Sequence, residues 1–133
     1  MNTVRAKIVQ LECSASITLV TLETEANILL QLLVIDTPQT ASYLQKGNTV
    51  RAIFKETEVI LALPTSKDIA IPNAIHAKIS KLEQDTFLTR VYLESAMGGL
   101  TALVHSETFR NLKIGLGDEV LALVKMNEIM LAQ

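Results

Sequence analysis

Apolar and polar residues alternate with a period of two along many short stretches of this chain. In Thr18–Glu23 the apolar positions Val20 and Leu22 fall on one face, and Thr89–Glu94 repeats that arrangement. A period of two places alternate side chains on opposite faces, which predicts β-strands with one buried face. The pattern therefore favours an all-β fold.

Five such stretches occur in each half of the chain. They read TVRAKIVQLE, SITLVTLE, ILLQLLVI, NTVRAIF and EVILA in the first half, and AIHAKISKLE, FLTRVYLE, LTALVHS, DEVLALV and EIMLA in the second. Only the three residues KET or KMN separate the last two stretches of each half. We expect these two strands to pair with each other through that turn.

The alternation stops between the third and fourth stretches, where DTPQTASYL and SETFRNLKI predict one or two helical turns. Thr37 precedes Pro38, which suits a helix N-cap followed by proline at the first helical position. Ser106 or Glu107 is expected to open the corresponding turn in the second half.

The two halves repeat each other in order and register. Arg5–Glu12 matches His76–Glu83 at an offset of 71 (76 − 5), whereas Gly47 matches Gly117 at an offset of 70 (117 − 47). One residue is therefore missing between these points, and the hairpin tip TEAN, which becomes SAMG, is the simplest place for it. A one-residue change inside a strand would turn every later side chain to the other face.

This organisation predicts two tandem modules, residues 1–63 and 72–133, joined by a linker at 64–71 that lies within the proline-containing stretch LPTSKDIAIP. Five short strands with a helical turn between strands 3 and 4 are typical of a small OB-like barrel. Because a unit of this size buries only a modest core, we expect the chain to self-associate into a homo-oligomer.

Composition narrows the function classes. The chain has 133 residues, a net charge of −2, no Trp, three Phe and two Tyr, which disfavours nucleic-acid binding by basic patches or stacked aromatics. Its longest apolar run, Ile28–Ile35, is too short to span a bilayer. No secretory signal opens the chain, so we expect a cytoplasmic protein without membrane contact.

Catalytic and metal-site signatures are absent from the sequence. The chain has no Gly-rich phosphate loop, no Gly-x-Ser-x-Gly elbow and no recognisable nucleophile–His–Asp set, so we expect no enzymatic activity. The single cysteine, Cys13, excludes a disulfide framework and a cysteine-based metal site. His76 and His105 are interpreted as ordinary strand residues, and no metal site is expected.

Several segments together carry a family resemblance. They are the AKI…LE strand near each module start, the run Val104–Val120, and the closing segments FKETEVILA and VKMNEIMLA. In these segments each half resembles the Mop/TOBE module of molybdate-binding proteins. The pair resembles the di-Mop arrangement of the molbindins and of the C-terminal half of molybdate-responsive repressors.

The resemblance implies binding of molybdate or tungstate for storage, homeostasis or sensing, without an organic cofactor. It also implies oligomers with swapped or shared strands, in which anions lie between modules near the helical turn and the lysine-containing turn. Such a dianion accepts hydrogen bonds and donates none, so its site needs hydroxyls, amides and one or two cations. The predicted oxyanion-binding residues are Lys55, Lys125, Thr57, Asn127, Thr37, Ser106, Thr108, Asn73 and Asn2.

The sequence also departs from the family pattern. The family's opening Ser-Ala-Arg-Asn-like stretch is Ala70–Asn73 here, which keeps only the Asn, and Asp36 and Glu107 would repel a dianion that they faced. Each predicted residue has an ordinary alternative as well. Turn lysines are commonly solvated, Thr37 and Ser106 fit helix caps, and Asn2 and Asn73 fit turns.

Two alternative functions remain open at this stage. One is a ligand-poor regulatory or dimerisation domain of a repressor or a transporter ATPase. The other, from a different class, is an OB-type oligonucleotide binder.

Overall fold

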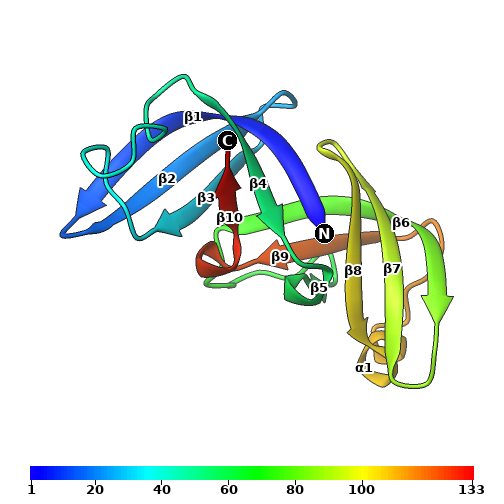
Figure 1. Ribbon diagram of the computed structural model, residues 1–133. Helices are drawn as coiled ribbons and strands as arrows, with labels where there is room; N and C mark the ends of the chain where they lie inside the picture. The colour runs from blue at the N-terminus through cyan, green and yellow to red at the C-terminus, as the bar shows by residue number, and fades with distance from the viewer.

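The computed structural model describes all of residues 1–133, which form ten strands in two five-stranded antiparallel sheets (Figure 1). Sheet one has the strand order β10-β4-β1-β2-β3, and sheet two has the corresponding order β5-β9-β6-β7-β8. The prediction of an all-β fold is confirmed. The strands are β1 (Asn2–Ser14), β2 (Ile17–Thr24), β3 (Leu29–Val34), β4 (Thr49–Phe54), β5 (Ile60–Ala62), β6 (Asn73–Gln84), β7 (Leu88–Ser95), β8 (Gly98–His105), β9 (Glu119–Val124) and β10 (Met130–Ala132).

The period-two pattern positions the core. In β1 the residues Asn2, Val4, Ala6 and Ile8 are buried, while the residues between them are exposed. The register of β1 on β2 shifts between Ile8 and Gln10, and β6 shifts at the equivalent place on β7. A bulge of this kind bends a strand. Each long first strand pairs mainly through its first half with one neighbour, β4 or β9, and mainly through its second half with the other, β2 or β7.

The last strand of each half pairs with the other half. β10 pairs with β4, so that Met130 lies opposite Ile53, and β5 pairs with β9, so that Ile60 lies opposite Leu123 (Figure 1). The expected hairpins between β4 and β5 and between β9 and β10 are therefore wrong. At Lys55 (φ −75°, ψ 150°) and Lys125 (φ −67°, ψ 149°) the backbone stays extended, and one turn of 3₁₀ helix then directs the chain to the other sheet. These turns are η1 (Glu56–Glu58) and η2 (Met126–Glu128).

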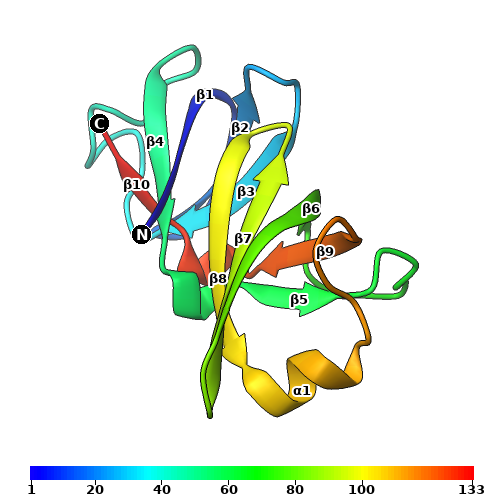
Figure 2. The same ribbon diagram turned by 90° about the vertical axis from the view of Figure 1, so that its right-hand side faces the viewer.

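The connection after the third strand differs between the halves. In the second half α1 (Ser106–Asn111) follows β8 and lies below the end of that strand (Figure 2). In the first half the amide of Ala41 donates to the carbonyl of Thr37, but residues 35–48 form turns without a helix. The prediction of a helical turn between strands 3 and 4 thus holds as a helix in the second half only.

The hairpin tips account for the missing residue. Thr24 bonds to Ile28 across three loop residues, whereas Ser95 lies opposite Gly98 across two. Shortening a hairpin tip preserves the strand register on both sides. The equivalent strands of the two halves therefore keep the same pairing despite the missing residue.

One continuous apolar core links the two sheets. A single cluster of 25 buried residues includes side chains from both, with Leu44 and Phe54 from the first half and Ile79 and Phe109 from the second. Because each sheet is completed by a strand from the other half, the two halves share this core. No helix of the chain is long and apolar enough to cross a membrane.

Candidate functional site

The two 3₁₀ turns create two seams between the halves of the chain. The η1 seam is formed by Lys55–Glu58 packed on β8, and the η2 seam is formed by Lys125–Glu128 packed on β3. Each seam brings a predicted lysine turn from one half against the third strand of the other half.

A hollow of about 320 Å³ opens at the η2 seam. The predicted residues Lys125 and Asn127 line it together with Met126, Leu33 of β3 and the segment Ala70–Pro72. The structure thus brings Lys125 and Asn127 together and adds a segment from outside the predicted set.

Three donor groups on the residues that line this hollow have no partner in the chain. Lys125 is exposed and takes part in no ion pair. The backbone amides of Ala70 and Ile71 donate no hydrogen bond within the chain, while Pro72 has no N–H. No carboxylate lines the hollow. A lining that contains one lysine, residues with free backbone amides and apolar side chains suits a small anion that needs donors.

The η1 seam has a different lining. Thr57 shares a hollow of about 330 Å³ with Thr108, and seven of its ten lining residues are apolar, including Leu103 and Phe109. His105 also lines it, with its Nδ1 atom 2.6 Å from Oγ1 of Thr108. The structure therefore brings Thr57 and Thr108 together, whereas Lys55 lies outside this hollow.

The two predicted asparagines act as clamps on the edge strands. Asn73 accepts from the amide of Gln31 at 2.7 Å through Oδ1, and its Nδ2 donates to the carbonyls of Gln31 at 2.7 Å and Val124 at 3.0 Å. Asn2 exchanges the equivalent pair of bonds with Thr101, at 2.8 and 2.9 Å. Both are buried strand residues, so their interpretation as turn formers is wrong.

Each clamp occupies the free edge of the other half's third strand. β3 and β8 end their sheets, and Gln31 and Thr101 present unpaired backbone groups at those edges. An asparagine side chain that pairs with both groups satisfies them and covers the edge. With three bonds, Asn73 has no N–H donor left for a ligand.

The two residues expected at helix starts are also engaged within the chain. Ser106 is fully buried, donates to the carbonyl of Asp85 and lies 2.8 Å from Oγ1 of Thr89. The N-cap of α1 is His105, whose Nδ1 accepts from the amide of Thr108. The interpretation of Ser106 as the cap is therefore wrong. His105 both ends strand β8 and caps helix α1.

In the first half, Thr37 lies in a self-contained turn. Its amide donates to Oγ1 of Thr40 at 2.8 Å, and its carbonyl accepts from the amides of Thr40 and Ala41. The Thr40 hydroxyl also lies 3.2 Å from a carboxylate oxygen of Asp36. The side chain of Thr37 caps no helix, so that expectation is wrong.

Two charged residues that the sequence reasoning did not select lie at the η1 seam. Glu56 of η1 forms an ion pair with Arg90 of β7, and their side chains are 23% and 38% exposed. Alignment of the two halves could have found this pair, because both charges are replaced by apolar residues in the other half. The position equivalent to Glu56 is Met126 (126 − 56 = 70), and the position equivalent to Arg90 is Leu19 (90 − 19 = 71).

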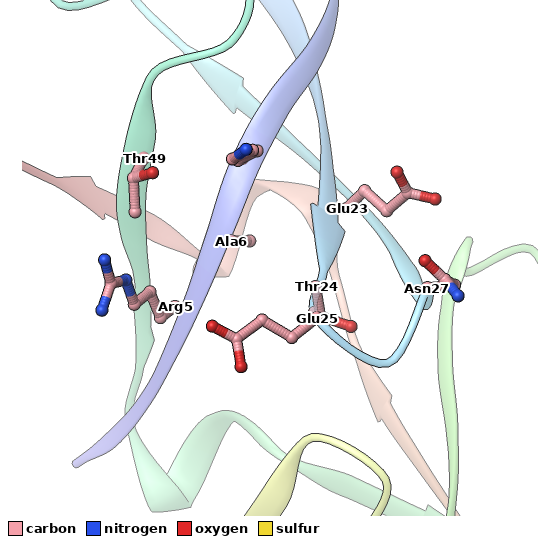
Figure 3. A pocket seen from close by; sticks show the side chains of 8 residues that line it. Arg5, Ala6, Glu23, Thr24, Glu25, Asn27 and Thr49 are labelled. Carbon is pink, nitrogen blue, oxygen red and sulfur yellow. The ribbon is translucent and has the colours of Figure 1, made fainter.

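Other polar features lie away from the seams. Arg5, Thr24 and Glu25 help to line a hollow of about 250 Å³ on sheet one, in which Arg5 lies toward Thr49 and Glu23 lies on the opposite side (Figure 3). It contains carboxylates as well as cations and none of the predicted residues. No cluster of three or more His, Cys, Asp and Glu side chains is arranged to hold a metal ion.

The surroundings of Tyr92 on β7 shift its titration. Its hydroxyl donates to the carboxylate of Glu83, and this hydrogen bond, with smaller contributions from desolvation and the negative charge of Glu83, raises the pKa of Tyr92. The ammonium of Lys81 lies 5.1 Å from the centre of the same ring. The charges of Arg90 and Glu56 at the η1 seam make smaller, opposing contributions to the pKa of Tyr92.

Comparison with known proteins agrees with this geometry. Residues 69–131 match the TOBE domain family, a range that contains the whole lysine turn of the second half. Across the whole chain, the fold is similar to a crystal structure of the cytoplasmic molybdate-binding protein ModG, determined with molybdate bound, with a TM-score of 0.91 and 19% sequence identity. The similarity covers 98% of this chain and 94% of ModG. No curated protein sequence matches the chain.

The recognition made from the lysine turns and the repeated strands is confirmed by the family match and by the shared architecture. Residues 69–131 therefore match the TOBE domain family, and the chain as a whole has a fold similar to that of ModG.

Proposed function

We propose that this chain binds a tetrahedral oxyanion, molybdate or tungstate, at seams between two tandem modules, residues 1–63 and 72–133, joined by residues 64–71. The observation that carries the proposal is the η2 hollow, which Lys125, Asn127, Ala70 and Ile71 line without any carboxylate residue. The backbone amides of Ala70 and Ile71 have no partner within the chain. The similarity to ModG, a molybdate-binding protein, supports the same ligand class.

The chemistry of the hollow fits a dianion that only accepts hydrogen bonds. A charge-assisted bond from Lys125 contributes on the order of 1.5–3 kcal/mol, and each neutral amide adds roughly 0.5–1.5 kcal/mol. With several donors and a dianion that leaves water only partly, affinity in the micromolar range, about −8 kcal/mol, is within reach.

The biological role proposed is storage, homeostasis or sensing of the oxyanion in the cytoplasm, by a homo-oligomer without enzymatic activity, organic cofactor, nucleic-acid partner or membrane contact.

Isothermal titration with molybdate, tungstate and sulfate tests the proposal. We expect saturable heat with molybdate and tungstate, and its loss in the double variant Lys55→Ala/Lys125→Ala. The matched control is Lys46→Ala/Lys78→Ala, which removes two exposed lysines that line neither seam hollow and is expected to leave binding unchanged. Equal binding by both double variants would place the anion elsewhere.

A second candidate function is a ligand-poor regulatory or dimerisation domain of a repressor or a transporter ATPase. It is favoured by the internal hydrogen bonds of Asn73 and Ser106, which leave these predicted donors unavailable to a ligand. Absence of heat with all three anions, together with a stable oligomer in sedimentation, would select this function.

A further inference from the structure

The two seams occupy equivalent places in the fold but differ in charge. Both have a lysine at the start of the 3₁₀ turn, Lys55 in one and Lys125 in the other. The next residue is Glu56 at the η1 seam and Met126 at the η2 seam. The two seams therefore differ in the charge of the side chain that follows the lysine.

At the η1 seam a carboxylate is held in place. Glu56 pairs with Arg90 and also lies 3.8 Å from the N-terminal ammonium of Met1. Arg90 lies opposite Leu103 in the register of β7 on β8, the strand on which η1 packs. Because the ion pair spans the seam and is partly buried, the carboxylate cannot turn away into solvent without breaking it. A dianion that approaches Lys55 meets this fixed negative charge, while the two nearby cations, the guanidinium of Arg90 and the ammonium of Met1, are already paired with Glu56.

At the η2 seam the same two positions are apolar. Leu19 lies opposite Leu33 in the register of β2 on β3, and Met126 lines the hollow beside Leu33. No carboxylate lines the hollow that contains Lys125. An apolar wall also lowers the local dielectric, which strengthens the attraction between that ammonium and a bound anion.

We infer that the two seams are not equivalent: the η2 seam is the anion site of the chain, and the Glu56–Arg90 pair closes the η1 seam to anions. This inference rests on the proposed function and assigns specificity to two residues, Glu56 and Arg90, that touch no anion. Binding therefore has a stoichiometry of one oxyanion per chain at the seams.

Titration calorimetry with molybdate on single lysine variants tests the assignment. Lys125→Met, which keeps an apolar stem and removes the ammonium, is expected to weaken binding at least tenfold. Lys55→Met is expected to change affinity less than twofold, as is the control Lys46→Met at an exposed lysine that lines neither seam hollow. Loss of binding in Lys55→Met with retention in Lys125→Met would overturn the inference and leave the proposed function standing.

A gain of binding tests the role of the ion pair. The double variant Glu56→Met/Arg90→Leu gives the η1 seam the residues of the η2 seam, and we expect its stoichiometry to rise from one to two anions per chain. Glu56→Gln, which removes the charge with little change of shape, is the second variant should the double variant misfold, as judged by circular dichroism. A stoichiometry of one in both variants would refute the closing role. Absence of heat from the wild-type chain with every anion would instead overturn the proposed function, and this inference with it.

Discussion

Replacing Asn73 by alanine tests the asparagine clamps, which tie the edge strand of one half to the first strand of the other. Asn73 is 1% exposed and makes three hydrogen bonds, two to the backbone of Gln31 and one to the carbonyl of Val124. Each such bond contributes roughly 1 kcal/mol net, and losing the side chain leaves backbone groups at the edge of β3 unpaired. Asn73→Ala should therefore destabilise the chain by about 3 kcal/mol.

Thermal and urea unfolding measure this loss. For a chain of this length about 3 kcal/mol corresponds to a fall in melting temperature of roughly 10 °C. Asn2→Ala, which removes two bonds to Thr101, should lose about 2 kcal/mol. Asn111→Ala is the matched control, because Asn111 is exposed and its side chain makes no hydrogen bond in the structure.

The ordering of these three variants is the decisive result. The clamps predict that Asn73→Ala loses more than Asn2→Ala, and that both lose more than Asn111→Ala. If Asn73→Ala is as stable as Asn111→Ala, the buried amide does not hold β3, and the account of how the halves are joined is refuted.

Two further predictions concern the strand exchange and Tyr92. Ile53 and Met130 lie opposite each other between β4 and β10, so the variant Ile53→Cys/Met130→Cys in a Cys13→Ser background should form a disulfide within one chain on mild oxidation. The product should migrate faster on a non-reducing gel than the single-cysteine controls. Absence of the faster band would contradict the strand exchange. The hydrogen bond from Tyr92 to Glu83 raises the pKa of Tyr92 above 10.0, so the folded state favours the protonated phenol. The resulting contribution to stability is present below pH 10 and is lost as the pH rises through the pKa of the folded state. Tyrosinate absorbance of the Tyr43→Phe variant isolates Tyr92 in this Trp-free chain, and Glu83→Gln should move its titration to lower pH; identical titrations with and without Glu83 would contradict the assigned cause.

Strand positions could be predicted from the sequence because one face of each strand is buried. Val4, Ala6 and Ile8 alternate with exposed residues in β1, and the same alternation marks β6. The one-residue difference between the halves was also placed in the right hairpin, since only a loop tip absorbs it without a change of register.

Strand exchange could not be predicted from the local pattern. The segments EVILA and EIMLA are nearly the same, and each fits against β4 or β9 equally well by hydrophobic pattern. The direction that the chain takes after Lys55 and Lys125 depends on backbone angles and on packing against the third strand of the other half. Neither is encoded in the spacing of apolar residues.

The burial of the two clamp asparagines could have been predicted from the sequence. Asn2 and Asn73 occupy the inward positions of the alternating pattern, in phase with Val4 and Ile75. A polar residue at an inward strand position is buried and needs internal partners, which is evidence against a role as a free ligand donor. The amides of Ala70 and Ile71 carry no such side-chain signal, so the rest of the η2 hollow became visible only in the structure.

The most direct test of the oxyanion site is a crystal of this chain soaked in tungstate, with anomalous scattering used to locate the metal. The account predicts a strong peak in the η2 hollow, within hydrogen-bonding reach of Lys125 and the amides of Ala70 and Ile71. Peaks confined to other surfaces, such as the hollow around Arg5 and Glu25, or no ordered peak at either seam, would contradict it.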